Sequence, residues 1–511
     1  MRSRPGVSPP PVSEPGRGAS SARRGRGAPL ARLLVLGGLL LAPPAAALPG
    51  LELGGGLEPA GGFGGRALFG GPTAAYFNPA LLPGAPRAVD LALVGSLRPL
   101  TITLDERPAA FDVDESILRA RIIDGATTRR PTQRPLPTAS LRQPRGAADP
   151  SAADLLFQLG ATWPVLPDTL TVGLLFLAPL GTLQAQQPFF VDEREQYFSN
   201  SLHFELYGDR LGGLGMACGL GWAPWPQLAL GLGVTLLNDS TARAEVYVPD
   251  ASDQRTAETN PEVAVGTRLA PHGGLVVRPF GDDTLQLTAT LHPVAENPVT
   301  GTSALQFWDY TYPEGEDALI QEYQLTYGYE PLRLGFGLAG RLGLGRVTLQ
   351  PYAEGVWARW STYRNRHAEE VADWADTLSL GLGVRLGQGP QTVSLAGLYA
   401  PSPVPEQTGR TSYVDNDRLG LQVGYRQEVQ VGSWPLALGV GLQVQRLLAR
   451  RHVKQPDAAE PVIDEFPDAV DVRSGEPLPR SAGLQTNSPG FPGYSSEGWL
   501  LGARVSLQVA Q

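Results

Sequence analysis

Cysteine is nearly absent from this chain of 511 residues, and Cys218 is its only example. A single thiol excludes an intrachain disulfide framework, and we expect the side chain to act only as a small apolar group. Histidine is also scarce, and the five histidines show no spacing typical of metal ligands, so we predict no metal site and no cofactor. They are His203, His272, His292, His367 and His452.

Basic residues are also fewer than acidic residues. The formal net charge of the chain is -9 at pH 7. Nucleic-acid binding needs a basic face, so a chain of this kind predicts no nucleic-acid partner. The sequence also shows no motif for a bound nucleotide or for coupling to an energy-transducing partner.

Beyond its N-terminal leader, the chain lacks an apolar run of helix length. The short run Leu33–Leu41 follows an arginine-rich stretch ending at Arg32, and the small residues Ala45–Ala47 come next. This order is typical of a secretory signal peptide, and the run is too short to span a bilayer as a helix. We therefore predict a signal peptide over residues 1–47 and a mature chain outside the cytoplasm.

The sequence contains many runs in which every second residue is apolar. Leu228, Leu230 and Leu232 alternate with small residues, and Leu334, Phe336 and Leu338 alternate with glycine. A soluble sheet with one apolar face would show the same pattern, but these runs reach the roughly 9–11 residues that a tilted strand needs to cross a bilayer. Further runs are Leu378–Leu386, Leu419–Tyr425, Leu436–Val444 and Trp499–Val509.

The connections between these runs are short and long in turn. Six tight turns alternate with seven long polar excursions, which is typical of outer-membrane barrels with periplasmic turns and extracellular loops. We therefore predict an all-β fold, an antiparallel transmembrane β-barrel of about 14 strands over residues 88–511. The predicted extracellular loops are 101–154, 178–200, 238–266, 293–321, 361–377, 400–417 and 450–497.

Aromatic residues gather where the two membrane interfaces would lie. Only a helix or a closed barrel satisfies every backbone group in lipid, so interfacial aromatic girdles support the barrel. The expected girdle near the short turns is Trp163, Trp222, Trp225 and Trp434. The expected girdle near the long loops is Trp357, Trp360, Tyr363, Tyr399 and Trp499.

The stretch from Gly61 to Pro83 fits neither a helix nor an alternating strand. Its many glycines open backbone conformations that other residues avoid, and Asn78-Pro79 ends it as a turn. It nevertheless carries aromatic side chains that must be covered. We therefore predict that residues 48–87 form a compact plug, or hatch, inside the barrel lumen.

Residues Asn78, Pro79 and Ala80 resemble the Asn-Pro-Ala hatch motif of the FadL family, bacterial outer-membrane channels for long-chain fatty acids and other hydrophobic compounds. Val356–Tyr363 is similar to the Trp-x-x-Trp-Ser strand end of these barrels. Tyr399–Arg418 is similar to the family's loop that ends in an Asp-x-Asp-Arg-like turn. The three motifs stand in family order, the strand number matches the family's fourteen, and the resemblance spans nearly all of the chain after the leader.

The resemblance implies a non-enzymatic, passive uptake channel that captures a hydrophobic small molecule and releases it when the hatch moves. The expected ligand is a long-chain fatty acid or a hydrocarbon. Aromatic hatch residues are candidate ligand contacts, and inward-facing arginines are candidates for a carboxylate, although barrels also pair such arginines with acids for structure alone. The candidates are Phe63, Phe69, Tyr76, Phe77, Arg333, Arg426 and Arg504.

The resemblance also implies a location in the bacterial outer membrane. The expected partners are outer-membrane lipid, lipopolysaccharide and the barrel assembly machinery. Outer-membrane barrels usually end in an aromatic residue, whereas the last residue here is Gln511.

Three other functions stay open from the residues. A FadL-like barrel can serve as an outer-membrane anchor or shuttle for secreted proteins, and the long loops would then be a docking surface. A lipid-modifying enzyme would need a nucleophile, a base and an acid near one rim, and no such set stands out. The apolar hatch disfavours a general polar porin.

Overall fold

In the computed structural model, fourteen antiparallel strands form a closed barrel. All described residues belong to one compact unit, Pro43–Gln511. The described residues are 51–52, 63, 65–105, 147–148, 152–180, 202–203, 215–249, 258–307, 311, 317–365, 368–409, 411–455, 458 and 493–510. The predicted signal peptide, residues 1–47, lies outside them.

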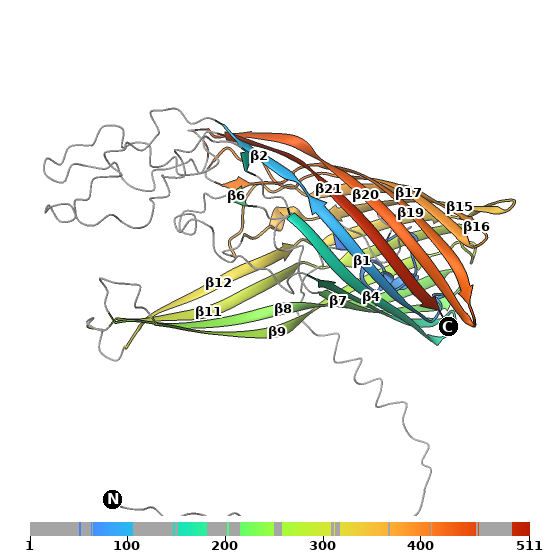
Figure 1. Cartoon of the computed structure of the whole chain (residues 1–511), viewed down its shortest axis with the longest axis horizontal. Helices are drawn as coiled ribbons and strands as arrows, with labels where there is room; N and C mark the ends of the chain where they lie inside the picture. Colours follow the sequence, from blue (N-terminus) through green and yellow to red (C-terminus); the bar gives the residue numbers. More distant parts are fainter. Residues whose placement is uncertain are drawn as a thin grey trace, which may run out of the picture. The chain divides into compact units, whose positions relative to one another are not determined.

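The barrel strands follow one another around the wall in chain order (Figure 1). They are β1 (Ala88–Arg98), β4 (Ala152–Leu166), β5 (Leu170–Pro179), β7 (Gly215–Trp225), β8 (Leu228–Val248), β9 (Glu258–Val277), β10 (Leu285–His292), β13 (Arg333–Gly340), β15 (Val347–Ala358), β16 (Thr377–Gln388), β17 (Gln391–Ala400), β19 (Arg418–Val431), β20 (Trp434–Val453) and β21 (Gly493–Ala510).

The remaining elements are short or lie outside this ring. They are α3 (Ala74–Phe77), η2 (Pro79–Leu81), η7 (Trp360–Thr362), β2 (Leu100–Leu104), β3 (Ala147–Ala148), β6 (Leu202–His203), β11 (Ala295–Phe307), β12 (Leu319–Glu330), β14 (Leu342–Leu344) and β18 (Ser412–Tyr413). Among the described residues, no helix is long and apolar enough to cross a membrane.

Closure comes from β1, which pairs on one side with β4 and on the other with β21. Ala88 lies opposite Thr162 of β4 and opposite Ala510 of β21, and both pairings are antiparallel. The other barrel strands are also paired antiparallel with both neighbours in the wall. The predicted all-β barrel of about 14 strands is confirmed.

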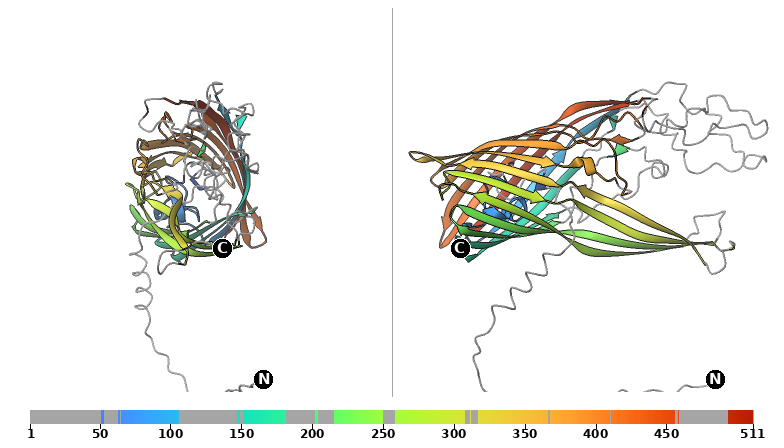
Figure 2. Two further views of the ribbon diagram at one scale, coloured as in Figure 1. Left: turned by 90° about the vertical axis from the view of Figure 1, so that its left-hand side faces the viewer. Right: turned by 180° about the vertical axis from the view of Figure 1, so that it is seen from behind.

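The tight turns lie at one end of the barrel, here called the short-turn end, and the long connections lie at the other, the long-loop end (Figure 2). Five short turns contain a residue with positive φ, which suits glycine or aspartate. These residues are Asp168, Gly281, Gly345, Gly389 and Gly432. Each lies in one of the six tight turns that the sequence pattern predicts, at 164–168, 223–227, 280–283, 343–346, 388–391 and 432–435.

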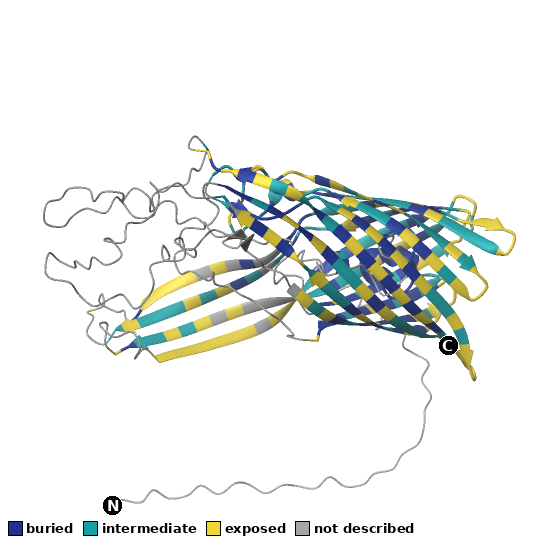
Figure 3. Ribbon diagram, turned by 45° about the horizontal axis from the view of Figure 1, so that its top comes forward, coloured by how far each residue is buried: buried dark blue, intermediate teal, exposed yellow. Residues whose placement is uncertain are grey.

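Side chains alternate between an exposed and a buried face along each strand (Figure 3). In β1, Leu93 is 47% exposed, whereas its neighbours Ala92 and Val94 are buried. In β20, Leu442 is exposed and Gln443 is buried. The apolar phase therefore covers the outside of the barrel, which suits lipid, and the polar phase faces the lumen.

Two of the predicted loops, 238–266 and 293–321, are largely strand. Beyond Leu236, β8 has no further pairing with β7, and β11 pairs there parallel to it, from Ser240 opposite Val299. Strands β9, β8, β11 and β12 form a four-stranded extension beyond the barrel rim (Figures 1 and 2). The sequence pattern missed these strands because their exposed polar side chains look like those of a loop.

Most predicted girdle aromatics are exposed on the outer wall. Trp163, Trp222, Trp225 and Trp434 near the short turns and Trp499 near the long loops are each more than two-fifths exposed. Trp360 and Tyr363 differ, because they are buried beneath the loops and not in a girdle. Tyr363 stacks on Trp374 with ring centroids 3.6 Å apart, and Val404 and Tyr413 join this cluster. The two later FadL-like segments therefore meet in one aromatic cluster.

Candidate functional site in the barrel lumen

The segment from Gly65 to Ala85 lies within the ring of strands (Figure 2). Two short helices, α3 and η2, meet at Asn78, whose extended backbone has φ -159° and ψ 90°. Pro79 follows as the first residue of η2, where its lack of an N–H costs no hydrogen bond. We use the name hatch for residues 51–85 where the structure describes them.

Asn78 holds the hatch together from its centre. Its Oδ1 accepts a hydrogen bond from the Ala80 backbone N–H at 3.2 Å, and its Nδ2 donates to the Arg66 carbonyl at 3.0 Å. The side chain is fully buried. Asn78 therefore caps η2 and ties it to the segment that precedes α3.

Wall glycines let the hatch backbone approach the strands directly. A Cβ on Gly231 of β8 would lie 2.1 Å from the Ala80 nitrogen, and a Cβ on Gly219 of β7 would lie 2.8 Å from the Ala75 Cα. Any side chain at these positions would push the hatch away from the wall. The Asn-Pro-Ala segment thus occupies a recess that exists only because the strands carry glycine there.

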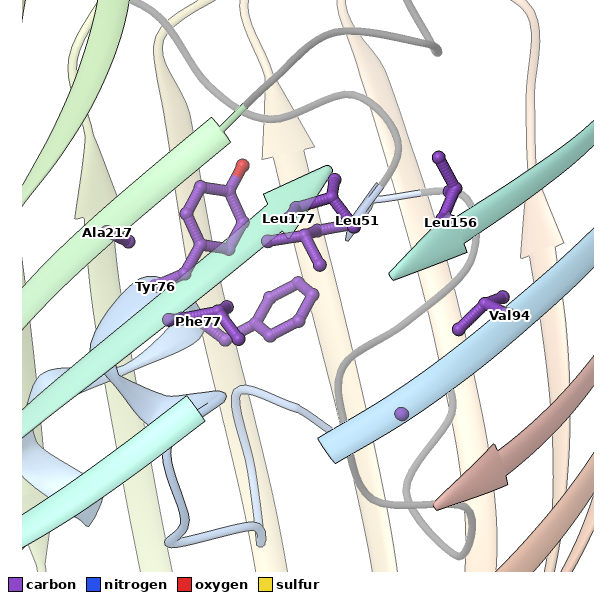
Figure 4. Close-up of a cluster of buried hydrophobic side chains, with 9 residues drawn as sticks. Leu51, Tyr76, Phe77, Val94, Leu156, Leu177 and Ala217 are labelled. Atoms are coloured by element: carbon purple, nitrogen blue, oxygen red, sulfur yellow. The ribbon is translucent and has the colours of Figure 1, made fainter. Parts of the chain in front are cut away.

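Three apolar clusters join the hatch to the wall, one of them between η2 and the wall residues Ala229 and Val276. Leu51, Tyr76 and Phe77 pack with inward residues of the barrel, including Val94 and Leu156 (Figure 4). A second cluster brings the other predicted aromatics against a different part of the wall. Its members are Phe63, Ala67, Phe69, Ala339, Tyr352 and Ala396.

A buried charge network lies beside the first cluster. Glu52 forms an ion pair with Arg66 at 2.6 Å, lies 3.6 Å from Arg333 Nη1, and accepts a hydrogen bond from the Tyr76 hydroxyl at 2.9 Å. Burial alone would raise the pKa of Glu52, but the charges of Arg66 and Arg333 and the Arg66 hydrogen bond bring that pKa below its usual range. Glu330 also pairs with Arg333, so the arginine bridges hatch and wall.

Two histidines lie beside the point where the pairing between β9 and β10 ends. Antiparallel pairing between β9 and β10 extends from Val277 to Gly273 and ends there. The next residue of β9 is His272, which stacks on His292 of β10 with ring centroids 4.8 Å apart and donates from Nε2 to the Ala75 carbonyl oxygen at 2.8 Å. Because a carbonyl oxygen accepts, Nε2 is the protonated nitrogen of His272. The stacked histidines thus lie at the end of the paired segment between β9 and β10, here called the β9–β10 seam, and His272 contacts the hatch.

A separate cavity opens on the luminal faces of β1, β4, β19, β20 and β21. Its polar lining includes Gln158, Gln422, Gln443 and Arg504, and its apolar lining includes Val94 and Leu156. The two apolar residues also belong to the hatch cluster. The cavity is therefore adjacent to the hatch.

The structure distributes the predicted ligand contacts over several places. The four hatch aromatics are buried against the wall in two clusters, and Arg333 is held by Glu52 and Glu330. Arg426 hydrogen-bonds to Gln508 and lies 3.6 Å from Glu428. Only Arg504 among the three arginines lines the cavity beside the hatch. Their roles in ligand binding stay predictions.

Sequence reasoning missed the groups that connect hatch and wall. Glu52, Arg66, His272 and His292 gave no motif, because their contacts join residues as far apart as Arg66 and Glu354, whose hydrogen bond is 3.1 Å. The inward glutamines could have been found, since they stand in the polar phase of alternating strands. Among the described residues, no group of histidine, cysteine, aspartate or glutamate side chains suits a metal ion.

No protein-family model and no curated protein matches the sequence. Several solved structures are similar to the chain. A Pseudomonas aeruginosa FadL homologue is 15% identical with a TM-score of 0.49, and the match covers 88% of this chain and 97% of that one. The Pseudomonas putida toluene transporter TodX is 12% identical with a TM-score of 0.40, covering 91% and 98%. The Ralstonia pickettii toluene transporter TbuX is 11% identical with a TM-score of 0.40, covering 89% and 98%.

Proposed function

We propose that this protein is a passive uptake channel for a hydrophobic small molecule, a long-chain fatty acid or a hydrocarbon, in a bacterial outer membrane. The observation that supports this most is the hatch, which seats on wall glycines such as Gly231 and buries Tyr76 and Phe77 against apolar wall residues. When the hatch shifts, this apolar surface becomes available to a ligand. Burying each CH₂ group of such a ligand is worth about 0.8 kcal/mol.

The orientation follows from the barrel plan. In outer-membrane barrels the short turns face the periplasm and the long loops face outward. With that orientation the hatch would close the lumen towards the periplasm. The outer wall would contact lipid and, on the outside, lipopolysaccharide, after insertion by the barrel assembly machinery. Residues 1–47 would direct export.

We place the release route at the hatch and the β9–β10 seam. Wall pairing ends there at Gly273 and Leu291, and only beyond that point do the histidines His272 and His292 stack. A displaced hatch would withdraw the Ala75 carbonyl from His272. A ligand could then leave sideways past the seam or downward past the hatch, with no energy-coupling component.

The test is equilibrium binding to the purified barrel in lipid nanodiscs. Dodecanoate and dodecane are each titrated into wild type and into a variant lacking Gly61 to Phe77. The deletion removes no barrel strand, so the barrel should still fold. We expect wild type to bind at least one ligand and the deletion to change its affinity. Binding of neither ligand to a folded wild-type barrel would remove the uptake proposal.

The four-stranded extension supports a second candidate, an outer-membrane anchor or shuttle for secreted proteins. Its strands β9 and β12 carry largely exposed side chains, with Val263 and Ile320 each more than three-fifths exposed. That surface could dock another protein. A shuttle predicts that shortening the β8–β9 hairpin abolishes export of its client while hydrophobic ligands fail to bind the lumen, whereas an uptake channel predicts ligand binding in the shortened barrel.

A further inference from the structure

The cavity beside the hatch contains two buried amide oxygens that have no hydrogen-bond partner in the part of the chain that the structure describes. The side chains of Gln158 and Gln422 are 1% and 6% exposed, and both line this cavity. Neither Oε1 atom has a hydrogen-bond partner among the described residues. Leaving a buried polar group unpaired is unfavourable, so these amide oxygens favour an occupant that supplies the missing hydrogen bonds.

The cavity has the size of a polar head group. The centre of a water molecule can reach about 40 Å³ of it. One water needs roughly 10–15 Å³ of such space. A hydroxyl or carboxyl group with its adjoining carbon fits this volume, whereas a long acyl chain does not.

The lining chemistry favours a group that both accepts and donates hydrogen bonds. The oxygens of Gln158 and Gln422 accept, and the guanidinium groups of Arg98 and Arg504 at the same cavity donate. Arg98 is also paired with Asp154, so the local charge is partly balanced. An unsubstituted hydrocarbon would leave the oxygens of Gln158 and Gln422 without a hydrogen-bond donor.

We propose that this cavity binds the small polar head group of an amphiphilic ligand through Gln158 and Gln422. This rests on the proposed uptake function and narrows its substrate class to amphiphiles bearing a hydroxyl group, because the two glutamine oxygens need a hydrogen-bond donor, which an ionised carboxylate lacks. Val94 and Leu156 line both the cavity and the hatch cluster. The tail of a ligand held here would therefore extend against Leu51 and Phe77, so binding favours displacement of the hatch (Figure 4).

Three probes of equal chain length test the proposal: dodecane, 1-dodecanol and dodecanoate. Each is titrated into the full barrel in nanodiscs, in wild type and in the double variant Gln158→Leu, Gln422→Leu. We expect wild type to bind dodecanol at least about tenfold more tightly than dodecane, because its hydroxyl group donates a hydrogen bond to a buried glutamine oxygen. Dodecanoate is the comparison with a head group that cannot donate to these oxygens. The double variant should lose this preference while keeping its affinity for dodecane. The exposed Gln391→Leu serves as the matched control and should behave as wild type.

The outcomes separate this proposal from the uptake function. If dodecanol binds wild type no more tightly than dodecane, the head-group site is refuted, while uptake stands. A preference that survives in the folded double variant also refutes the assignment. If no probe binds, the uptake function itself fails. The comparison of the probes on wild type needs no variant, so it can refute the head-group site even if the double variant does not fold.

Discussion

A Cβ atom on Gly274 of β9 would lie only 2.0 Å from Oδ1 of Asn78. The same oxygen caps η2 through the Ala80 nitrogen. The oxygen that caps η2 therefore also lies against the wall, at a position where the strand carries no side chain. Hatch closure depends on the absence of a side chain in the wall as much as on the asparagine itself.

Gly274→Ala should displace the hatch without preventing barrel formation. The new methyl group points into the lumen and overlaps Asn78, and overpacking of this kind costs about 1–3 kcal/mol. We expect higher single-channel conductance and greater sensitivity of cells to a large polar antibiotic such as vancomycin. Gly95→Ala is the control, since a Cβ on Gly95 has no atom within 4 Å. Equal conductance of the two variants would show that the hatch does not seat on Gly274.

Asn78→Ala should loosen the hatch from within. It leaves the Ala80 N–H and the Arg66 carbonyl without their partner, at a cost of about 1–3 kcal/mol. Hydrogen exchange of residues 65–82 should become faster, while exchange in the barrel strands stays unchanged. Asn78→Ser offers one shorter hydroxyl group in place of the two amide atoms, so it can cap η2 but cannot replace both hydrogen bonds, and its exchange rate should lie between those of wild type and Asn78→Ala. Unchanged exchange in Asn78→Ala would mean that these hydrogen bonds do not hold the hatch.

The contribution of Glu52 to hatch docking should change with pH only under acid conditions. Its pKa in the folded protein is below the ordinary 4.5, so its contribution is complete above about pH 4.5 and is lost as the pH falls through the folded value. The difference in exchange of residues 65–82 between wild type and Glu52→Gln should therefore be constant from pH 8 to pH 5.

The variant Glu52→Gln tests the same pair at neutral pH. It removes the charge facing Arg66 and Arg333, and breaking a buried ion pair costs about 3–5 kcal/mol. Glu428→Gln is the control, since Glu428 is 62% exposed and lies 3.6 Å from Arg426, where an ion pair is worth about 0–1 kcal/mol. If both variants dock their hatches equally well, the Glu52 network is not what holds it.

Lys454 is the only lysine in the sequence and should titrate near neutrality. It follows β20 at the long-loop end, and Nζ donates to the Thr411 carbonyl at 2.6 Å. Burial lowers its pKa from 10.5 to about 7. Protein labelled with ¹³C-lysine should show one side-chain signal with a midpoint near pH 7, and a midpoint above 9 would contradict the burial.

The same shift predicts how stability changes with pH. Between pH 7 and 10.5 the unfolded chain holds the lysine proton and the folded chain does not, so stability rises with pH. The gain approaches about 1.4 kcal/mol per pH unit. Urea unfolding of wild type between pH 7 and 10 should show this rise, and Lys454→Met should lack it.

Much of the barrel could be predicted because its pattern is local. Alternation such as that of Leu228, Leu230 and Leu232 repeats within one strand, and the turn glycines Gly389 and Gly432 stand between strands. The extension was missed because solvent on both faces removes the contrast between apolar and polar positions. Trp360 was assigned to a girdle because sequence distance from a loop does not tell whether a side chain points out or in.

The sequence by itself determined the strand period, the turn positions and the presence of an irregular apolar segment that needed cover. Only the tertiary structure decided what covers it: Gly274 beside Asn78, Glu52 between Arg66 and Arg333, and two glutamines open to the cavity. The physical reason is the sequence separation between the residues that determine each feature. Strand period and turn conformation depend on neighbouring residues, whereas the site forms from strands that closure of the barrel brings together from positions hundreds of residues apart.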